Sequence, residues 1–111
     1  MPDRRLIQSW LLLFFLLPVA ASAGSLSAER QNELYNLLLQ DCGSCHGMRL
    51  TGGLGPPLTT TALTGKSREF LIHTISAGRP GTPMPPWKNL LKPDEIRWLV
   101  DYLLAQKGSG S

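Results

Sequence analysis

The sequence predicts an all-α protein with a single small domain. Three stretches place apolar residues at the spacing of one helix face, and each starts with a residue that commonly begins a helix. Two segments rich in glycine and proline separate these stretches, and no stretch alternates apolar with polar residues as a half-buried strand would. The chain has 111 residues, which is enough for one domain.

The first predicted helix starts at Ser27, whose hydroxyl can cap it, and runs into Cys42. Its buried face is marked by three leucines at i, i+3 and i+4 spacing: Leu34, Leu37 and Leu38. Residues 47–63 follow and are rich in glycine, proline and threonine, so an irregular loop is predicted there.

The second predicted helix starts at Ser67 and ends at Gly78, a residue that commonly closes a helix. Residues 79–87 contain four prolines, which exclude a helix and restrict the backbone of this loop. The third predicted helix begins at Pro93, a favoured first helical position, and Gly108 lies past its end.

A secretory signal is predicted at residues 1–23. Two arginines precede an apolar run at residues 10–17, and small residues follow up to Ala23. The apolar run is shorter than the ~20 residues of a membrane span, so we expect cleavage after Ala23; retention as a membrane anchor is the alternative. The expected domain then comprises residues 24–107, with a flexible tail at residues 108–111.

The charge balance of the predicted mature chain is close to neutral. Removing one acidic and two basic residues with the signal leaves nine basic and seven acidic residues, from totals of 11 and 8. This balance lacks the excess of basic residues that is typical of proteins that bind nucleic acids or anionic membranes, so neither class of partner is expected. Any partner must be recognised through local patches.

Cys42-Gly43-Ser44-Cys45-His46 has the Cys-x-x-Cys-His spacing of c-type haem attachment. The two thiols lie on one helical turn, where each can bond one vinyl group of a porphyrin. This places the imidazole of His46 beneath the iron as its proximal ligand. Since haem is attached to exported chains in bacteria outside the cytoplasm, the motif and the signal together predict a periplasmic protein.

Three other interpretations of the cysteines are weaker. A redox-active Cys-x-x-Cys belongs beside a βαβ pattern, and no strand pattern precedes Cys42. A zinc site needs four ligands, and the chain adds only His73 to the motif, with no His-x(3-5)-His or second Cys-x-x-Cys to complete a tetrahedron. A disulfide across two residues would close a very small loop and constrain the unfolded chain little.

The second axial position of the iron has several candidate occupants: Met48, His73, Met84, water or a substrate. Met48 follows His46 by two residues and cannot reach the opposite face. His73 could give bis-histidine coordination, although a surface histidine on an amphipathic helix is the simpler interpretation. Met84 is the better candidate, because the prolines around it limit the conformations of its loop.

The order of these motifs resembles that of class I, mitochondrial-type, cytochrome c domains. The resemblance covers Ser27 to Lys107 and rests on the order helix, Cys42-x-x-Cys45-His46-Gly47, Gly55-Pro56-x-Leu58, helix, Met84-Pro85-x-Trp87, helix. It implies a globule of three to five helices around one covalently attached haem c. It also implies thioether bonds at Cys42 and Cys45 and axial ligands at His46 and Met84.

The resemblance also assigns roles around the haem. It implies that the Pro56 carbonyl accepts a hydrogen bond from the free nitrogen of His46. Tyr102 resembles the aromatic residue that the last helix contributes where it crosses the first, near the haem edge. Leu34 departs from the family pattern, because many members have a small residue at this crossing; a looser or shifted crossing is therefore expected.

A narrower resemblance concerns the two loops. The run from Cys42 to Pro56 and the run from Gly78 to Trp87 look like those of small periplasmic cytochromes found with dissimilatory haem-type nitrite reductase. That resemblance implies electron donation to the reductase in denitrification. The alternative is acceptance of electrons during maturation of the reductase's d-type haem.

A haem with both axial positions filled by the protein has no open site for substrate, so we expect a monomeric electron carrier and no enzyme. Arg49, Arg79 and Trp87 lie in or near the haem loops and could hydrogen-bond a propionate, although ordinary solvated charge also explains the arginines. If Met84 does not bind iron, a haem-based sensor or enzyme is the alternative. Redox partners are expected to dock weakly at the haem edge.

Overall fold

The computed structural model describes residues 25–106, and within this range the regular elements are helices without any strand. The predicted signal and the predicted tail lie outside the described residues. The all-α prediction is confirmed. The elements follow in the order α2 (Ala28–Leu37), η2 (Leu38–Cys42), α3 (Gly43–His46), α4 (Arg68–Ala77), η3 (Trp87–Asn89) and α5 (Pro93–Ala105).

The three main helices begin where the sequence predicts. The hydroxyls of Ser27 and Ser67 each accept a hydrogen bond from the backbone N–H three residues on, at 3.1 Å in both cases. Pro93 is the first residue of α5. Since each start depends on residues adjacent in sequence, local chemistry alone sets it.

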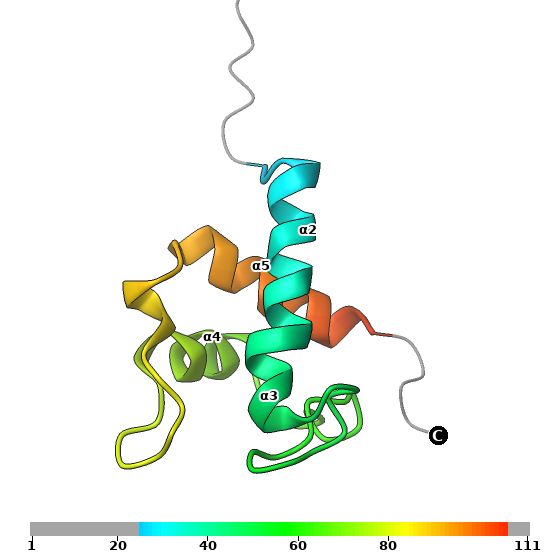
Figure 1. Ribbon diagram of the computed structural model, residues 1–111, viewed down its shortest axis with the longest axis vertical. Coiled ribbons are helices and arrows are strands. Elements are labelled where there is room, and N and C mark those ends of the chain that lie inside the picture. Colours follow the sequence, from blue (N-terminus) through cyan, green and yellow to red (C-terminus); the bar gives the residue numbers. More distant parts are fainter. Residues whose placement is uncertain (1–24, 107–111) are drawn as a thin grey trace, which may run out of the picture.

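The first helix is less regular than predicted. Its α-helical hydrogen bonds end at Leu37, and Leu38–Cys42 form a π-helical turn before α3 begins. The backbone angles stay in the right-handed helical region at Leu37 (φ −60°, ψ −44°) and Gly43 (φ −62°, ψ −25°), so the coil continues without a break. Figure 1 shows α2 to α3 as one column, which α5 crosses. A π-helical turn widens the helix and is frequent at functional sites.

The structure adds one short element to those predicted, and the end of the last helix agrees with the prediction that Gly108 lies past it. A single 3₁₀ turn forms at Trp87–Asn89, just after the proline-rich loop. The last helix ends at Ala105, and Gln106 is already extended at φ −61° and ψ 122°, so the helix stops before Gly108.

The core is formed mainly by leucines from the helices and from the loops between them. Among the described residues ten hydrophobic side chains are buried: Leu34, Leu38, Leu50, Leu63, Leu71, Leu91, Ile96, Leu99, Val100 and Leu103. Leu34 is 0 % exposed, so the larger side chain at the helix crossing is fully accommodated. The loop residue Leu50 is buried in a left-handed conformation, φ 58°, which shows that its burial outweighs the backbone strain.

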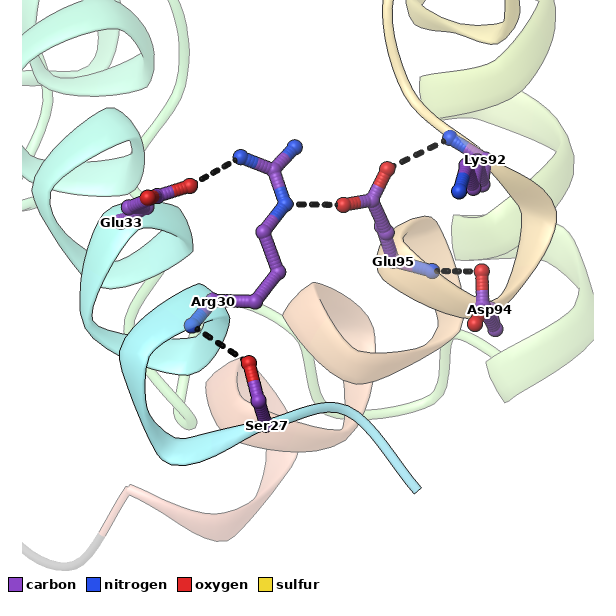
Figure 2. A network of polar contacts seen from close by, with 6 residues as sticks. All are labelled: Ser27, Arg30, Glu33, Lys92, Asp94 and Glu95. Atoms are coloured by element: carbon purple, nitrogen blue, oxygen red, sulfur yellow. Dashed lines mark hydrogen bonds and ion pairs between the residues drawn. The ribbon is translucent and has the colours of Figure 1, made fainter. Parts of the chain in front are cut away.

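Two ion pairs tie α5 to the other helices. Arg68 at the start of α4 binds Asp101 through two nitrogens, at 2.6 Å and 3.0 Å. Arg30 of α2 donates through Nε to Glu95 of α5 and through Nη1 to Glu33 at 2.6 Å (Figure 2). The contact between Arg30 and Glu95 joins the beginning of the described chain to its last helix.

Glu95 is the one buried charged residue of the described chain, 4 % exposed. Besides Arg30 it accepts a hydrogen bond at 2.9 Å from the backbone N–H of Lys92, which precedes α5. The Arg30 guanidinium and then the Lys92 N–H stabilise the charged form, so the pKa of Glu95 is lowered despite its burial. The carboxylate therefore both caps α5 and joins it to α2.

We expect the Glu95→Gln variant to lose about 1–3 kcal/mol of unfolding free energy at pH 7. A carboxyl whose pKa is lowered on folding stabilises the fold above its unfolded pKa of about 4.3, and this contribution disappears as pH falls through the lowered value. Urea unfolding at pH 7 and pH 3 should therefore show a difference between variant and parent that shrinks in acid. Glu29→Gln, at an exposed first-turn position, is the control and should cost less than about 1 kcal/mol. A difference that grows in acid would contradict this role of Glu95.

Candidate haem-binding site

The loop after α3 folds back over the end of this short helix. The N–H of Gly52 donates to the His46 carbonyl and that of Gly55 to the Cys45 carbonyl, each at 2.8 Å. Gly47 reverses the chain at φ 93°, and a Cβ there would lie 2.7 Å from the Gly52 oxygen. Only glycine permits this turn, so the loop is held close to the predicted attachment motif.

His46 is the last residue of α3 and its ring is held by the same loop. Its Nδ1 lies 2.6 Å from the Pro56 carbonyl oxygen, which is the contact that the resemblance implies. A carbonyl can only accept, so the proton of a neutral imidazole must be on Nδ1. This leaves the lone pair on Nε2, the atom suited to bind a metal.

Gly55 lies against the His46 ring from the same loop. A Cβ at this position would be 2.8 Å from both Nδ1 and Cε1 of the imidazole. The backbone of Gly55 therefore limits how far the ring can turn, while Pro56 fixes its hydrogen bond. The sequence alone does not predict this contact of Gly55 with the His46 ring; the one signal for it is the position of Gly55 directly before Pro56.

Cys42 and Cys45 are free thiols, both half-buried. Cys42 ends the π-helical turn and packs against the core, while Cys45 lies within α3. Burial, aided by the charge of Asp41, raises the pKa of the Cys42 thiol to about 11. A reactive redox cysteine needs a lowered pKa, so the structure disfavours the thioredoxin-type alternative.

Met84 is half-buried in a loop that its own hydrogen bonds close. The Arg79 N–H donates to the Met84 carbonyl at 3.2 Å, and the Met84 N–H donates to the Thr82 hydroxyl at 3.3 Å. The Thr82 hydroxyl in turn donates to the Arg79 carbonyl at 2.6 Å. The prolines predicted a restricted loop; Thr82 adds restraint that the sequence had not indicated. This loop and α3 reach the same end of the molecule (Figure 1).

The other predicted residues lie in different surroundings. Tyr102 packs edge-on against Tyr35 of α2, with ring centroids 5.5 Å apart, which confirms the expected contact between the first and last helices. Trp87 is half-buried against the core, whereas Arg49 and Arg79 are exposed.

Neither of the other two candidate iron ligands is buried. Met48 is 66 % exposed, and His73 is exposed on α4, as expected for a surface histidine.

A hollow of about 330 Å³ lies beside the crossing of α2 and α5. Two of the predicted haem-edge residues, Arg49 and Tyr102, line it, and none of the four predicted attachment and axial residues does. The complete lining is Tyr35, Leu38, Leu39, Arg49, Leu50, Tyr102 and Gln106.

The residues of the motif fit a covalently attached haem. The two thiols are unpaired and lie three residues apart on one continuous helical coil, and Cys42 packs against the core. The Nδ1 atom of the adjacent His46 imidazole contacts the Pro56 carbonyl, which leaves Nε2 as the nitrogen that can bind iron. Within residues 25–106, no three His, Cys, Asp or Glu side chains cluster as a conventional metal site, and no helix is long and apolar enough to cross a bilayer.

The sequence pattern of the family described as "Cytochrome C oxidase, cbb3-type, subunit III" matches residues 28–103. The chain belongs to the cytochrome c family. Membership of this family implies covalently bound haem c, in agreement with the spacing of Cys42 and Cys45. It also agrees with the helical fold and with the half-buried thiols described above.

Curated proteins named cytochrome c55X are similar to this cytochrome c chain. The Pseudomonas aeruginosa protein is 65 % identical over 77 residues, which cover 69 % of this chain and 65 % of that protein. The Stutzerimonas stutzeri protein is 59 % identical over 91 residues, covering 82 % of this chain and 80 % of that one. The chain thus spans just under two thirds of the first relative's length.

Among solved structures, one described as "c-type cytochrome NirC" superposes with a TM-score of 0.69 and 63 % sequence identity. The superposition covers 71 % of this chain and 93 % of that structure. The narrower similarity therefore extends from the two loops to 71 % of this chain.

Proposed function

We propose that the chain is a periplasmic electron carrier with one haem c, bound covalently through Cys42 and Cys45. His46 and Met84 are its axial ligands in this proposal, and the carrier works as a monomer. The observation that supports it best is the His46 Nδ1 contact with the Pro56 carbonyl at 2.6 Å. This contact selects the imidazole tautomer whose Nε2 can bind iron.

When bound, the haem supplies an iron that changes between its ferric and ferrous states. The Pro56 carbonyl orients the His46 ring and increases the basicity of the nitrogen that faces the iron. Met84 closes the second axial position, and a thioether opposite an imidazole favours the ferrous state. With both positions filled there is no site for a substrate, so electron transfer is outer-sphere and the chain is no enzyme itself.

The nitrite reductase of denitrification is the proposed redox partner, and three observations support it. The solved structure at 63 % identity is described as "c-type cytochrome NirC", and the loops resemble those of cytochromes found with this reductase. A third observation concerns charge: the two segments between the main helices, residues 47–66 and 78–92, contain no acidic residue. Their five basic residues are exposed: Arg49, Lys66, Arg79, Lys88 and Lys92. Exposed basic side chains without acidic neighbours in the same segments favour a partner with an acidic docking face.

Mixing the reduced protein with active nitrite reductase in a stopped-flow instrument tests this proposal. We expect rapid oxidation of the ferrous carrier, with a rate that falls as ionic strength rises. Arg79→Glu combined with Lys88→Glu should slow the reaction, on the order of tenfold at low salt. The control Arg97→Glu combined with Lys107→Glu makes the same change of charge outside these segments and should have a smaller effect.

A second candidate function rests on a separate similarity. The chain is 34 % identical over 97 residues to part of a Pseudomonas aeruginosa protein named dihydro-heme d1 dehydrogenase, covering 18 % of that protein. Dehydrogenation releases two electrons and two protons, so two ferric carrier molecules would each accept one electron from such an enzyme. Reduction of the ferric protein in this reaction, without oxidation of the ferrous protein by nitrite reductase, would favour this function over electron donation.

Cleavage of the predicted signal, which would release the exported carrier from the membrane, has its own test. The intact mass of the exported protein should equal residues 24–111 plus one haem. Retention of Met1 to Ala23 would contradict a carrier free of the membrane.

A further inference from the structure

Gly78 ends α4 in a conformation that other residues avoid. Its backbone angles are φ 67° and ψ −169°, a region that is essentially restricted to glycine. It is also buried, although it belongs to the connection between a helix and a loop.

The reason for its burial is the loop that carries Met84. A Cβ at Gly78 would lie 2.7 Å from the Met84 carbonyl oxygen and 2.6 Å from the carbonyl carbon of Pro85. Both atoms belong to the backbone, so they cannot rotate away as the end of a flexible side chain could. Any side chain at this position must therefore move the Met84–Pro85 peptide.

The next residue holds the same peptide by a hydrogen bond. The N–H of Arg79 donates to the Met84 carbonyl at 3.2 Å. Helix α4, which directly precedes both residues, is itself fixed, because Leu71 is in the core and Arg68 binds Asp101 of α5. The backbone of Met84 is therefore positioned relative to α4 and α5 by contacts of the protein alone.

Two other glycines with positive φ, on either side of Gly78 in the sequence, have no close contact. Gly81, in the same loop, has φ 79°, and Gly65, before α4, has φ 83°. A Cβ at either position would meet nothing within 4 Å. Close approach to the Met84 loop thus distinguishes Gly78 from them.

We propose that Gly78 is a positioning residue for the axial methionine. The absence of a side chain at the end of α4 lets the Met84–Pro85 peptide lie against the helix, and this contact sets the place from which the Met84 sulfur reaches the iron. The inference rests on the proposed axial role of Met84.

The test compares haem-attached Gly78→Ala with Gly81→Ala by the far-red sulfur-to-iron charge-transfer band of the ferric protein. We expect Gly78→Ala to lose most of this band and to bind imidazole at least roughly tenfold more tightly than the parent. Gly81→Ala should retain the band. Haem attachment should be unchanged in both variants, since the Cys42 to His46 side is not altered.

Two outcomes would overturn different claims. If the parent protein itself lacks the band while its haem is attached, the axial role of Met84 fails. If the parent has the band and Gly78→Ala keeps it with unchanged imidazole affinity, only the positioning role of Gly78 fails. Should the variant not accumulate, NMR of the reduced parent decides: the proposal requires nuclear Overhauser contacts between the Gly78 α-protons and the α-proton of Pro85, and their absence overturns it.

Discussion

Replacing both motif cysteines, Cys42→Ser and Cys45→Ser, is expected to abolish covalent haem attachment and to leave the chain without a stable fold. The domain is small, and its core is formed by ten buried hydrophobic side chains. Domains of this size are marginally stable unless a further group adds to the core. A porphyrin fixed to Cys42, which packs against that core, would supply such a group.

The measurements are the intact mass, a pyridine-haem assay and far-ultraviolet circular dichroism. The parent should carry the mass of one haem, and the double variant should carry none and show a large loss of helix signal. Ser44→Ala is the matched control, because Ser44 lies between the cysteines and keeps both thiols when it is replaced; its hydroxyl donates to the Asp41 carbonyl at 2.8 Å and lies 3.9 Å from the Cys45 sulfur. Covalent haem in the double variant would contradict the assigned attachment site.

The single variants should differ in severity. Cys42 packs against the core, and a serine there places a hydroxyl among apolar side chains without a predicted partner. Cys45 lies in α3 outside that cluster. We therefore expect Cys42→Ser to lower the yield of folded haem protein more than Cys45→Ser does.

Helix starts could be predicted from the sequence because each depends on a few neighbouring residues. Ser27, Ser67 and Pro93 act on backbone groups within one turn. The π-helical turn at Leu38–Cys42 could not be predicted in this way, because its residues have ordinary helical backbone angles at both ends. Only the backbone hydrogen bonds, which skip one more residue than in an α-helix, reveal the turn, and these depend on how the folded chain packs.

The candidate site likewise has features that the sequence predicts and features that it does not. The spacing of the attachment motif is a local property and was readable, while the Pro56 contact followed from resemblance to a family. The close contacts at Gly55 and Gly78 join residues six or more positions apart through folded loops. A glycine can occur in a loop for many reasons, so its sequence position alone did not identify which glycines touch a proposed axial ligand.

Leu34→Ala is expected to lower the unfolding free energy of the haem-attached protein by about 2–5 kcal/mol. Family resemblance suggests the reverse, because many cytochromes of this class have a small residue where the first and last helices cross. A smaller side chain would then allow a closer crossing. In this chain, however, Leu34 is 0 % exposed and belongs to the same core cluster as Leu99 and Val100 of α5.

The decisive point is whether the helices can close over the space that the leucine leaves. Arg30 and Glu95 join α2 to α5 near one end of the crossing, and the Tyr35–Tyr102 pair holds another contact between them. These contacts fit the present separation, so closing the gap would disturb both, and a cavity is expected to remain. Urea unfolding of Leu34→Ala against Leu104→Ala, whose side chain is 38 % exposed, measures the difference. Equal stability of the Leu34 variant and the parent would mean that the helices do close and that the crossing adapts to the size of this residue.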